Sequence, residues 1–208
     1  QRVGLARSFR VPAGVNPQAA TLRLAVFPRS GILTDLVLVA AGAGFVALAA
    51  QFEIKLWFTP VPITGQTFAV LLVGASLGAL RGAASLGLYF LVGLAGAPIY
   101  AGGEGGWEWV KGATGGYLVG FILAAAVTGW LAERRWDRRF NSAVAAMLTG
   151  SVVIYALGLP WLAHVADTGL EDTLELGLYP FVVGDLLKLY LAGALLPGAW
   201  RLVQRFRG

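Results

Sequence analysis

The sequence has no cysteine and only one histidine, His164, among its 208 residues. The lack of cysteine excludes disulfides, thiolate metal sites and cysteine nucleophiles, and a single histidine excludes any multi-histidine metal site. Charge is also scarce, because only 13% of the residues are Asp, Glu, Lys or Arg, against about 25% in a typical soluble domain. The chain therefore lacks the polar surface that would cover a water-soluble globule.

Hydrophobic residues are abundant instead. They make up 57% of the chain, the mean hydropathy is +0.71, and 29 residues are glycine, which lets membrane helices pack closely. The composition predicts an all-α integral membrane protein with several spans. The sequence contains no H-E-x-x-H motif, no G-x-S-x-G motif and no paired intramembrane carboxylates. We therefore expect no catalytic residue, no metal and no cofactor in this chain.

The apolar stretches predict six transmembrane helices within a membrane domain over residues 31–203. One stretch, residues 67–99, contains a single charge, Arg81. It would form about 50 Å of helix, too long for a hydrocarbon core of about 30 Å, so we predict a break near Gly78–Gly82. The predicted spans cover about 32–52, 66–80, 82–98, 115–132, 142–162 and 180–200. Residues 1–30 are predicted to form a cytoplasmic arm and residues 204–208 a cytoplasmic tail.

The charges are distributed unevenly between the two sides of this predicted topology. Thirteen of the sixteen basic residues fall on the side of the chain termini, and seven of the eleven acidic residues fall in the opposite loops. Because cytoplasmic loops of membrane proteins are enriched in Lys and Arg, we expect both termini in the cytoplasm and the protein in the cell membrane. The net charge of +5 then reflects topology and contact with membrane lipids, and we expect no nucleic-acid partner.

Two charges interrupt the last apolar segment, VVGDLLKLYLAGALL. If a helix enters the membrane near Pro180, Asp185 lies about 8 Å deep and Lys188 about 12 Å deep. Their i, i+3 spacing places them on one helical face. One interpretation is a structural ion pair, or a lysine that reaches outward to the interface. The other, which we favour, is a site for a small polar head group that offers both donors and acceptors.

Two further segments carry alternative interpretations. The glycine-rich segment 102–121 lies on the same side of the membrane as Asp185, and its glycines would let the backbone approach a ligand. Trp107 and Trp109 within it are either interfacial anchors or caps over a pocket. In the first span the small residues form two pairs, Ala43 with Ala47 and Ala40 with Gly44. Such faces favour close helix contact, either within the chain or with a partner.

Several motifs together resemble one family. PVPITGQTFAVLLVGASLGALRG (60–82), LAGAPIYAGGEGG and GATGGYLVGF, with the D-x-x-K pair of the last span, are similar to BioY, the biotin-specific S components of energy-coupling-factor (ECF) vitamin transporters. The resemblance covers about residues 31–200. It implies a six-helix S-component bundle that captures biotin with high affinity from outside the cell. Uptake would require a transmembrane coupling protein (BioN or its general T-component counterpart) and two ABC ATPase subunits, which would hydrolyse the ATP.

The resemblance also implies roles for individual residues. Asp185 and Lys188 would bind the biotin ring, and the first-span small residues, above all Ala43 and Ala47, would dock on the coupling protein. Some members have an arginine or proline just before T-G-G-Y, where this chain has Ala113, so Lys111 is our candidate for the biotin carboxylate. Residues expected beside the ligand are Thr114, Gly115, Gly116, Tyr117, Tyr89, Tyr100 and Trp107.

Three other functions remain open from the residues. An S component for another vitamin would keep the same architecture. A stand-alone secondary transporter would often show paired repeats and discontinuous helices in both halves, which this sequence does not clearly contain. An intramembrane enzyme would need a catalytic constellation that the sequence lacks.

Overall fold

The computed structural model describes residues 21–27 and 31–205. Most of the predicted arm over residues 1–30, and residues 206–208 of the predicted tail, therefore lie outside the described residues. Within the arm, a short helix, α1 (Leu22–Val26), begins after Thr21, whose hydroxyl accepts from the N–H of Leu24. Its Ala25 packs with Trp200 near the C-terminal end of the last helix.

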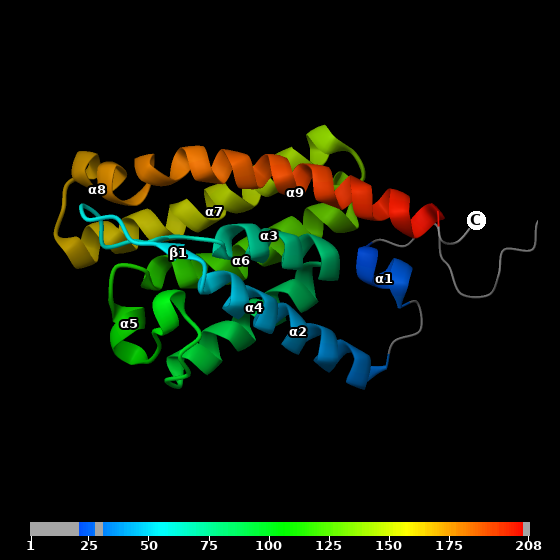
Figure 1. Cartoon of the computed structure of the whole chain (residues 1–208), viewed down its shortest axis with the longest axis horizontal. Helices are drawn as coiled ribbons and strands as arrows, with labels where there is room; N and C mark the ends of the chain where they lie inside the picture. Colours follow the sequence, from blue (N-terminus) through cyan, green and yellow to red (C-terminus); the bar gives the residue numbers. More distant parts are fainter. Residues whose placement is uncertain (1–20, 28–30, 206–208) are drawn as a thin grey trace, which may run out of the picture.

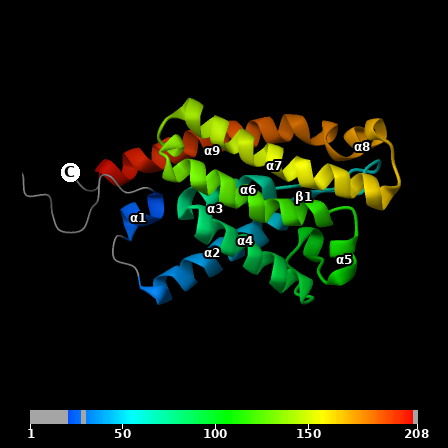
Figure 2. The same cartoon turned by 180° about the vertical axis from the view of Figure 1, so that it is seen from behind.

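Six apolar helices form the body of the molecule, and each predicted span falls on one of them (Figure 1). They are α2 (Ile32–Ala50), α3 (Gln66–Leu77), α4 (Ala79–Leu94), α6 (Gly115–Glu133), α7 (Phe140–Ala166) and α9 (Tyr179–Arg205). Short elements connect them: β1 (Glu53–Ile54), β2 (Ile63–Thr64), the 3-10 turns η1 (Ala101–Gly103) and η2 (Trp136–Arg138), α5 (Trp107–Lys111) and α8 (Leu170–Gly177). Figures 1 and 2 show α5 and α8 at one end of the bundle, called here the α8 end, and α1 at the opposite α1 end.

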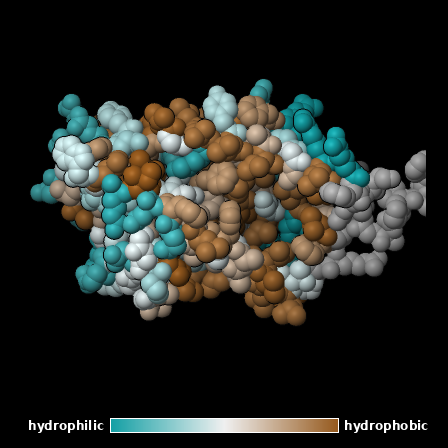
Figure 3. Space-filling view, in the orientation of Figure 1, coloured by the Kyte–Doolittle hydropathy of each residue, from teal (hydrophilic) through white to brown (hydrophobic). Residues whose placement is uncertain are grey.

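The helices have the length and surface of membrane spans. Among the described residues, α2, α6, α7 and α9 are long and apolar enough to cross a membrane, whereas α3 and α4 are apolar helices of 12 and 16 residues. Large hydrophobic side chains are exposed along α2, including Ile32, Leu36 and Leu48. Figure 3 shows hydrophobic residues over the middle of the molecule and hydrophilic residues gathered mainly at the α8 end and along the end of α9. The protein is therefore a helical membrane protein.

The break between α3 and α4 falls at Gly78, inside the predicted range. Gly78 has φ +89°, a left-handed conformation that ends α3. The first free N–H of α4, that of Ala79, donates to the Glu133 carboxylate of α6 at 2.9 Å. The neighbouring helices touch through their backbones, since a Cβ on Gly74 would lie 2.5 Å from the carbonyl oxygen of Ala125. This packing holds the C-terminal half of α3 directly against α6.

Two segments that the hydropathy pattern predicts as loops contain short elements. In the segment 53–64, the short strands β1 and β2 at its two ends pair antiparallel, with Glu53 opposite Thr64 and Ile54 opposite Ile63. Residues 170–177 form α8, which buries Thr173 and Gly177. In α8 the hydroxyl of Thr173 donates to the carbonyl oxygen of Gly169. Hydropathy did not indicate either element because both are short and partly polar.

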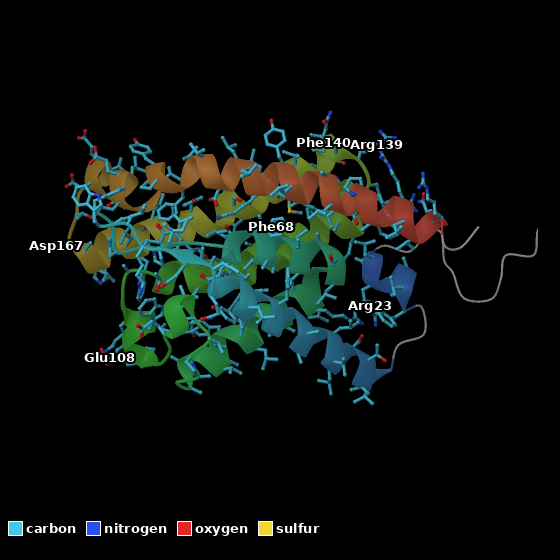
Figure 4. The ribbon with its side chains drawn as sticks, in the orientation of Figure 1. Arg23, Phe68, Glu108, Arg139, Phe140 and Asp167 are labelled. Atoms are coloured by element: carbon cyan, nitrogen blue, oxygen red, sulfur yellow. The ribbon has the colours of Figure 1, made fainter. Side chains whose placement is uncertain are left out.

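Oppositely charged residues gather at the two ends. Figure 4 shows Glu108 and Asp167 at the α8 end, with Arg23 and Arg139 at the α1 end. There Asp35 of α2 accepts from Arg23 of α1 on one oxygen and from Arg81 of α4 on the other, the latter at 2.7 Å. Asp35 thus ties three helices together.

A second polar contact stabilises the α1 end. The indole N–H of Trp200 in α9 donates to the carboxylate of Asp137 in η2, and the Arg138 guanidinium stacks 3.3 Å from the Trp200 ring. Asp137 is 1% exposed, and this burial raises the pKa of its carboxyl to about 6. The contact fixes the turn between α6 and α7 against the end of α9.

The small residues of α2 divide between two faces, which corrects one expectation. Ala43 is buried in the core and Ala47 packs partly against it, because this face of α2 contacts the chain's own helices. Ala43 is therefore not on a surface available to a partner. Ala40 and Gly44 are exposed, and a Cβ on Gly44 would meet no atom within 4 Å. The exposed small face of α2 is the Ala40–Gly44 pair.

Candidate ligand-binding site

A cavity opens toward the α8 end between α3, α6, α7 and α9. Its wall is mostly apolar, with a few polar side chains, as in many small-molecule sites. The residues that line it are Val61, Pro62, Thr64, Gln66, Thr67, Ala101, Trp109, Thr114, Tyr117, Leu118, Phe121, Ile154, Tyr155, Phe181, Asp185 and Lys188. The cavity brings together segments from most of the described chain, and both charges of the last span face it.

Asp185 and Lys188 form a linked polar cluster with two side chains from other helices. The Lys188 ammonium donates to Asp185 Oδ1 at 2.9 Å and to the Thr67 hydroxyl of α3 at 3.0 Å. That hydroxyl lies 3.3 Å from Asp185 Oδ1, to which it donates. The Tyr155 hydroxyl of α7 donates to Asp185 Oδ2. Asp185 is 7% exposed, so water contributes little to its solvation. The three donors stabilise its charge instead.

The cluster keeps unused hydrogen-bonding capacity that faces the cavity. An ammonium has three N–H donors, and two of those of Lys188 are used by contacts within the described chain. A carboxylate can accept about four hydrogen bonds, and Asp185 accepts three there. One donor of Lys188 and one acceptor of Asp185 therefore remain, on two residues that both line the cavity. This arrangement suits a ligand that presents an N–H next to a carbonyl group, such as a urea or an amide.

Gln66, at the start of α3, supplies another polar group to the wall. Its amide donates to the Tyr89 hydroxyl at 2.8 Å and its carbonyl accepts from Thr64 at 2.9 Å. The Tyr89 hydroxyl in turn donates to the carbonyl oxygen of Ile99. The buried amide is thus held in one orientation, with Tyr89 behind it rather than at the cavity wall.

The α8 end is fastened by hydrogen bonds between its short elements. The Tyr117 hydroxyl donates to the carbonyl oxygen of Gly177 at 3.0 Å, and the Thr59 hydroxyl donates to that of Leu176 at 2.6 Å. The indole N–H of Trp161 donates to the carbonyl oxygen of Gly112 at 2.9 Å. These bonds tie α8 to α6 and to the β1–β2 connection, and they tie α7 to the end of α5.

The structure brings only part of the predicted site to the cavity. Asp185, Lys188, Thr114 and Tyr117 line it. Gly115 and Gly116 instead provide close packing, because a Cβ would lie 1.8 Å from the Val110 carbonyl oxygen at the first and 2.3 Å from the Trp161 Cβ at the second.

The other predicted residues lie away from the cavity. Tyr100 is buried against Gly93 with its hydroxyl donating to the Phe90 carbonyl oxygen, and burial raises the pKa of Tyr100 to about 12. Trp107 is 59% exposed. Lys111 pairs with Glu108 at 2.8 Å and does not line the cavity. Aromatic character and loop position did not distinguish these side chains from Trp109, which does line it.

Several lining residues were not predicted, and two of them carried a signal. Thr67 belongs to the polar run T-G-Q-T that precedes an apolar span, and Tyr155 is a hydroxyl in the middle of another span. Neither signal identifies Asp185 as the residue contacted, because Thr67 and Tyr155 are 118 and 30 residues away from it along the chain. Among the described residues, no group of three or more His, Asp or Glu side chains could hold a metal ion.

Comparison with known proteins agrees with the architecture. A crystal structure of the S-component for biotin from an ECF-type ABC transporter superposes with a TM-score of 0.71 at 25% identity, covering 85% of this chain and 93% of that one. A "Biotin transporter BioY" of Rhizobium etli is 40% identical over 169 residues, which cover 77% of this chain and 90% of the relative. Another, of Thermotoga maritima, is 36% identical and covers 79% and 89%. The profile of the BioY family matches residues 18–205, and the chain belongs to this family.

Proposed function

We propose that this chain is the biotin-binding S component of an ECF-type ABC importer. The relatives are named biotin transporters, and the structural neighbour is an S component for biotin. The observation that carries the proposal is the spare donor of Lys188 beside the spare acceptor of Asp185 at the wall of an otherwise largely apolar cavity. The chain would bind and deliver its ligand without changing it chemically.

Biotin fits the chemistry of this wall. Its ureido ring presents N–H donors beside a carbonyl acceptor, which match the Asp185 carboxylate and the Lys188 ammonium respectively. The carbon and sulfur atoms of its fused ring are apolar and would lie against Phe121, Ile154 and Phe181, and its apolar valeryl chain would lie against other apolar residues of the wall. Thiamin and riboflavin differ in shape and in the order of their hydrogen-bonding groups, so they would satisfy the cluster less well.

The orientation follows from the positive-inside rule. The α1 end carries the arginines and the α8 end carries most acids, so the α1 end would face the cytoplasm and the cavity would open outside the cell. In this arrangement all six apolar helices cross the cell membrane, with α3 and α4 as short spans. Biotin would enter from the extracytoplasmic side.

The import step would use partners that supply the energy. A transmembrane coupling protein and two ABC ATPases would move the ligand inward, with docking on the exposed Ala40–Gly44 face of α2. A groove lined in part by Gly44, Phe45 and Leu48 lies there. Because Gly44 has open space around it, Gly44→Phe should keep biotin binding and abolish uptake. Normal uptake by this variant would exclude the face from docking.

Titration of the purified protein with biotin, thiamin and riboflavin tests the ligand. We expect biotin alone to bind tightly. Asp185→Asn and Lys188→Ala should each weaken binding about tenfold to a hundredfold or more, because a hydrogen bond to a charged group contributes about 1.5–3 kcal/mol. Asp172→Asn, which neutralises an exposed acid of α8, is the matched control and should bind normally. Wild-type affinity in the two site variants, or tighter binding of another vitamin, would contradict the proposal.

A further inference from the structure

A second cavity, lined by six residues, lies next to the ligand cavity at the α8 end and is called here the outer cavity. Five of its lining residues come from the β1–β2 connection and one from α5: Lys55, Leu56, Thr59, Pro60, Pro62 and Trp109. Pro62 and Trp109 line both cavities. Figures 1 and 2 agree that the β1–β2 connection reaches the α8 end beside α8. The two cavities therefore adjoin at Pro62 and Trp109.

The outer cavity lies in an acidic part of the molecule, so a lysine beside it bears on whether an anionic ligand group can bind there. The described elements at the α8 end carry seven acidic residues and only two lysines, Lys55 and Lys111. An anionic group on a ligand would be repelled by the acids unless a cation lies close to it. A lysine that lines the outer cavity would offset this field for the anionic end of a ligand.

Of these two lysines, only Lys55 lines one of the two cavities. Both lysines pair with a glutamate, the Lys111 ammonium with Glu108 at 2.8 Å, so the ion pairs do not distinguish them. Lys55 lines the outer cavity, and its ammonium is 3.2 Å from Glu53. An ammonium carries three donors, so this ion pair leaves capacity for a second anion. The Lys55 side chain is 67% exposed, so it is able to reorient toward a ligand.

We propose that Lys55 binds the carboxylate of the transported ligand and so selects ligands that end in an anion. The inference rests on the proposed function, because biotin carries its carboxylate at the opposite end of the valeryl chain from the ureido ring. With the ring at Asp185 and Lys188, the valeryl chain passes Pro62 and Trp109 and the carboxylate reaches Lys55. This assignment replaces Lys111, the candidate from sequence.

Binding of biotin and of biotin methyl ester to the purified full chain tests this inference. The ester keeps the ureido ring and valeryl chain but lacks the charge. Lys55→Gln should weaken biotin binding about two- to fivefold, the size expected for an exposed ion pair, and leave ester binding unchanged. Lys111→Gln, which also removes an exposed lysine paired with a glutamate, should change neither affinity. Added salt should weaken biotin binding in the wild type more than in Lys55→Gln.

The outcomes separate this inference from the proposed function. Equal effects of Lys55→Gln on biotin and its ester, no effect on either, or a loss carried by Lys111→Gln would overturn the role of Lys55 while biotin binding stands. Equal affinity of the wild type for both ligands would overturn it in the same way. A wild-type protein that binds neither ligand would overturn the proposed function and this inference together. Unfolding temperatures of both lysine variants should match the wild type, since both side chains are at the surface.

Discussion

Two carboxylates of this membrane protein each accept from side chains of neighbouring helices, yet the partners differ in charge. Asp35 at the α1 end accepts an arginine guanidinium on each oxygen, from α1 and from α4. Asp185 accepts from one ammonium and from two uncharged hydroxyls, those of Thr67 and Tyr155, and lines a cavity. The first cluster joins charges from three helices, whereas the second lies at the wall of the ligand cavity, where its unused donor and acceptor can meet a ligand. An intramembrane charge therefore indicates a ligand site when its cluster also lines a cavity.

Removing both charges of the ligand cluster should have the largest effect. We expect Asp185→Asn combined with Lys188→Met to weaken biotin binding about 10²- to 10⁴-fold, because two hydrogen bonds to charged groups are lost. Its stability should equal or exceed that of either single variant, since each single change leaves one buried charge without its counterion. Isothermal titration and thermal unfolding in detergent measure the two quantities. A double variant less stable than both singles would show that the pair, like the Asp35 cluster, mainly stabilises the fold.

Removing one uncharged donor from Asp185 should have an intermediate effect. Thr67→Val and Tyr155→Phe keep the side-chain volume nearly unchanged and delete a single hydroxyl each. We expect each to weaken biotin binding about tenfold, because Asp185 and Lys188 lose the groups that hold them in position. Gln66 and the rest of the wall are unaltered, so the preference for biotin over other vitamins should persist. Unchanged affinity in both variants would show that the two charged residues position themselves without help.

Asp35→Asn should affect stability and leave ligand binding nearly unchanged. The substitution removes the charge that joins Arg23 and Arg81 and leaves two guanidiniums facing each other, so the unfolding temperature should fall. The dissociation constant for biotin should stay within about twofold, because Asp35 pairs with Arg23, which lies at the α1 end (Figure 4), whereas the cavity opens toward the α8 end. A large loss of affinity with an unchanged unfolding temperature would reverse the roles we assign to the two clusters.

The smallest expected effect is the pH dependence due to Asp137. Burial raises the pKa of its carboxyl to about 6, above its ordinary value of 3.8, so the folded protein holds this proton more tightly than the unfolded chain. Its contribution to stability is fully present below about pH 4 and is lost as the pH rises through about 6. Relative to Asp137→Asn, the wild type should therefore lose unfolding temperature between these values. A difference between the two proteins that does not vary with pH would contradict this.

Local sequence was sufficient for the features that depend on neighbouring residues. The i, i+3 spacing placed Asp185 and Lys188 on one helical face, and their ion pair is present at 2.9 Å. The length of the apolar stretch 67–99 required an interruption, and Gly78, which adopts φ +89°, lies there. The family resemblance indicated biotin transport, and the family is confirmed over residues 18–205.

Contacts across the chain could not be predicted in this way. Glycines 115 and 116 looked like a backbone site for ligand, but their positions against Val110 and Trp161 make them packing residues. Ala43 looked like a docking residue, but the rotation of α2 relative to α3 and α4 buries it. Periodicity predicts which residues share a face, whereas only packing decides which face is covered.

The sequence by itself determined the membrane class, the apolar helices and the presence of a paired charge in the last one, because hydropathy and helical spacing are local properties. Tertiary structure decided that Thr67 and Tyr155 contact that pair and that Lys55 rather than Lys111 lies at a cavity. The physical reason is that hydrogen bonds to a buried charge come from whichever helices packing brings within about 3 Å, and that proximity is independent of separation along the chain.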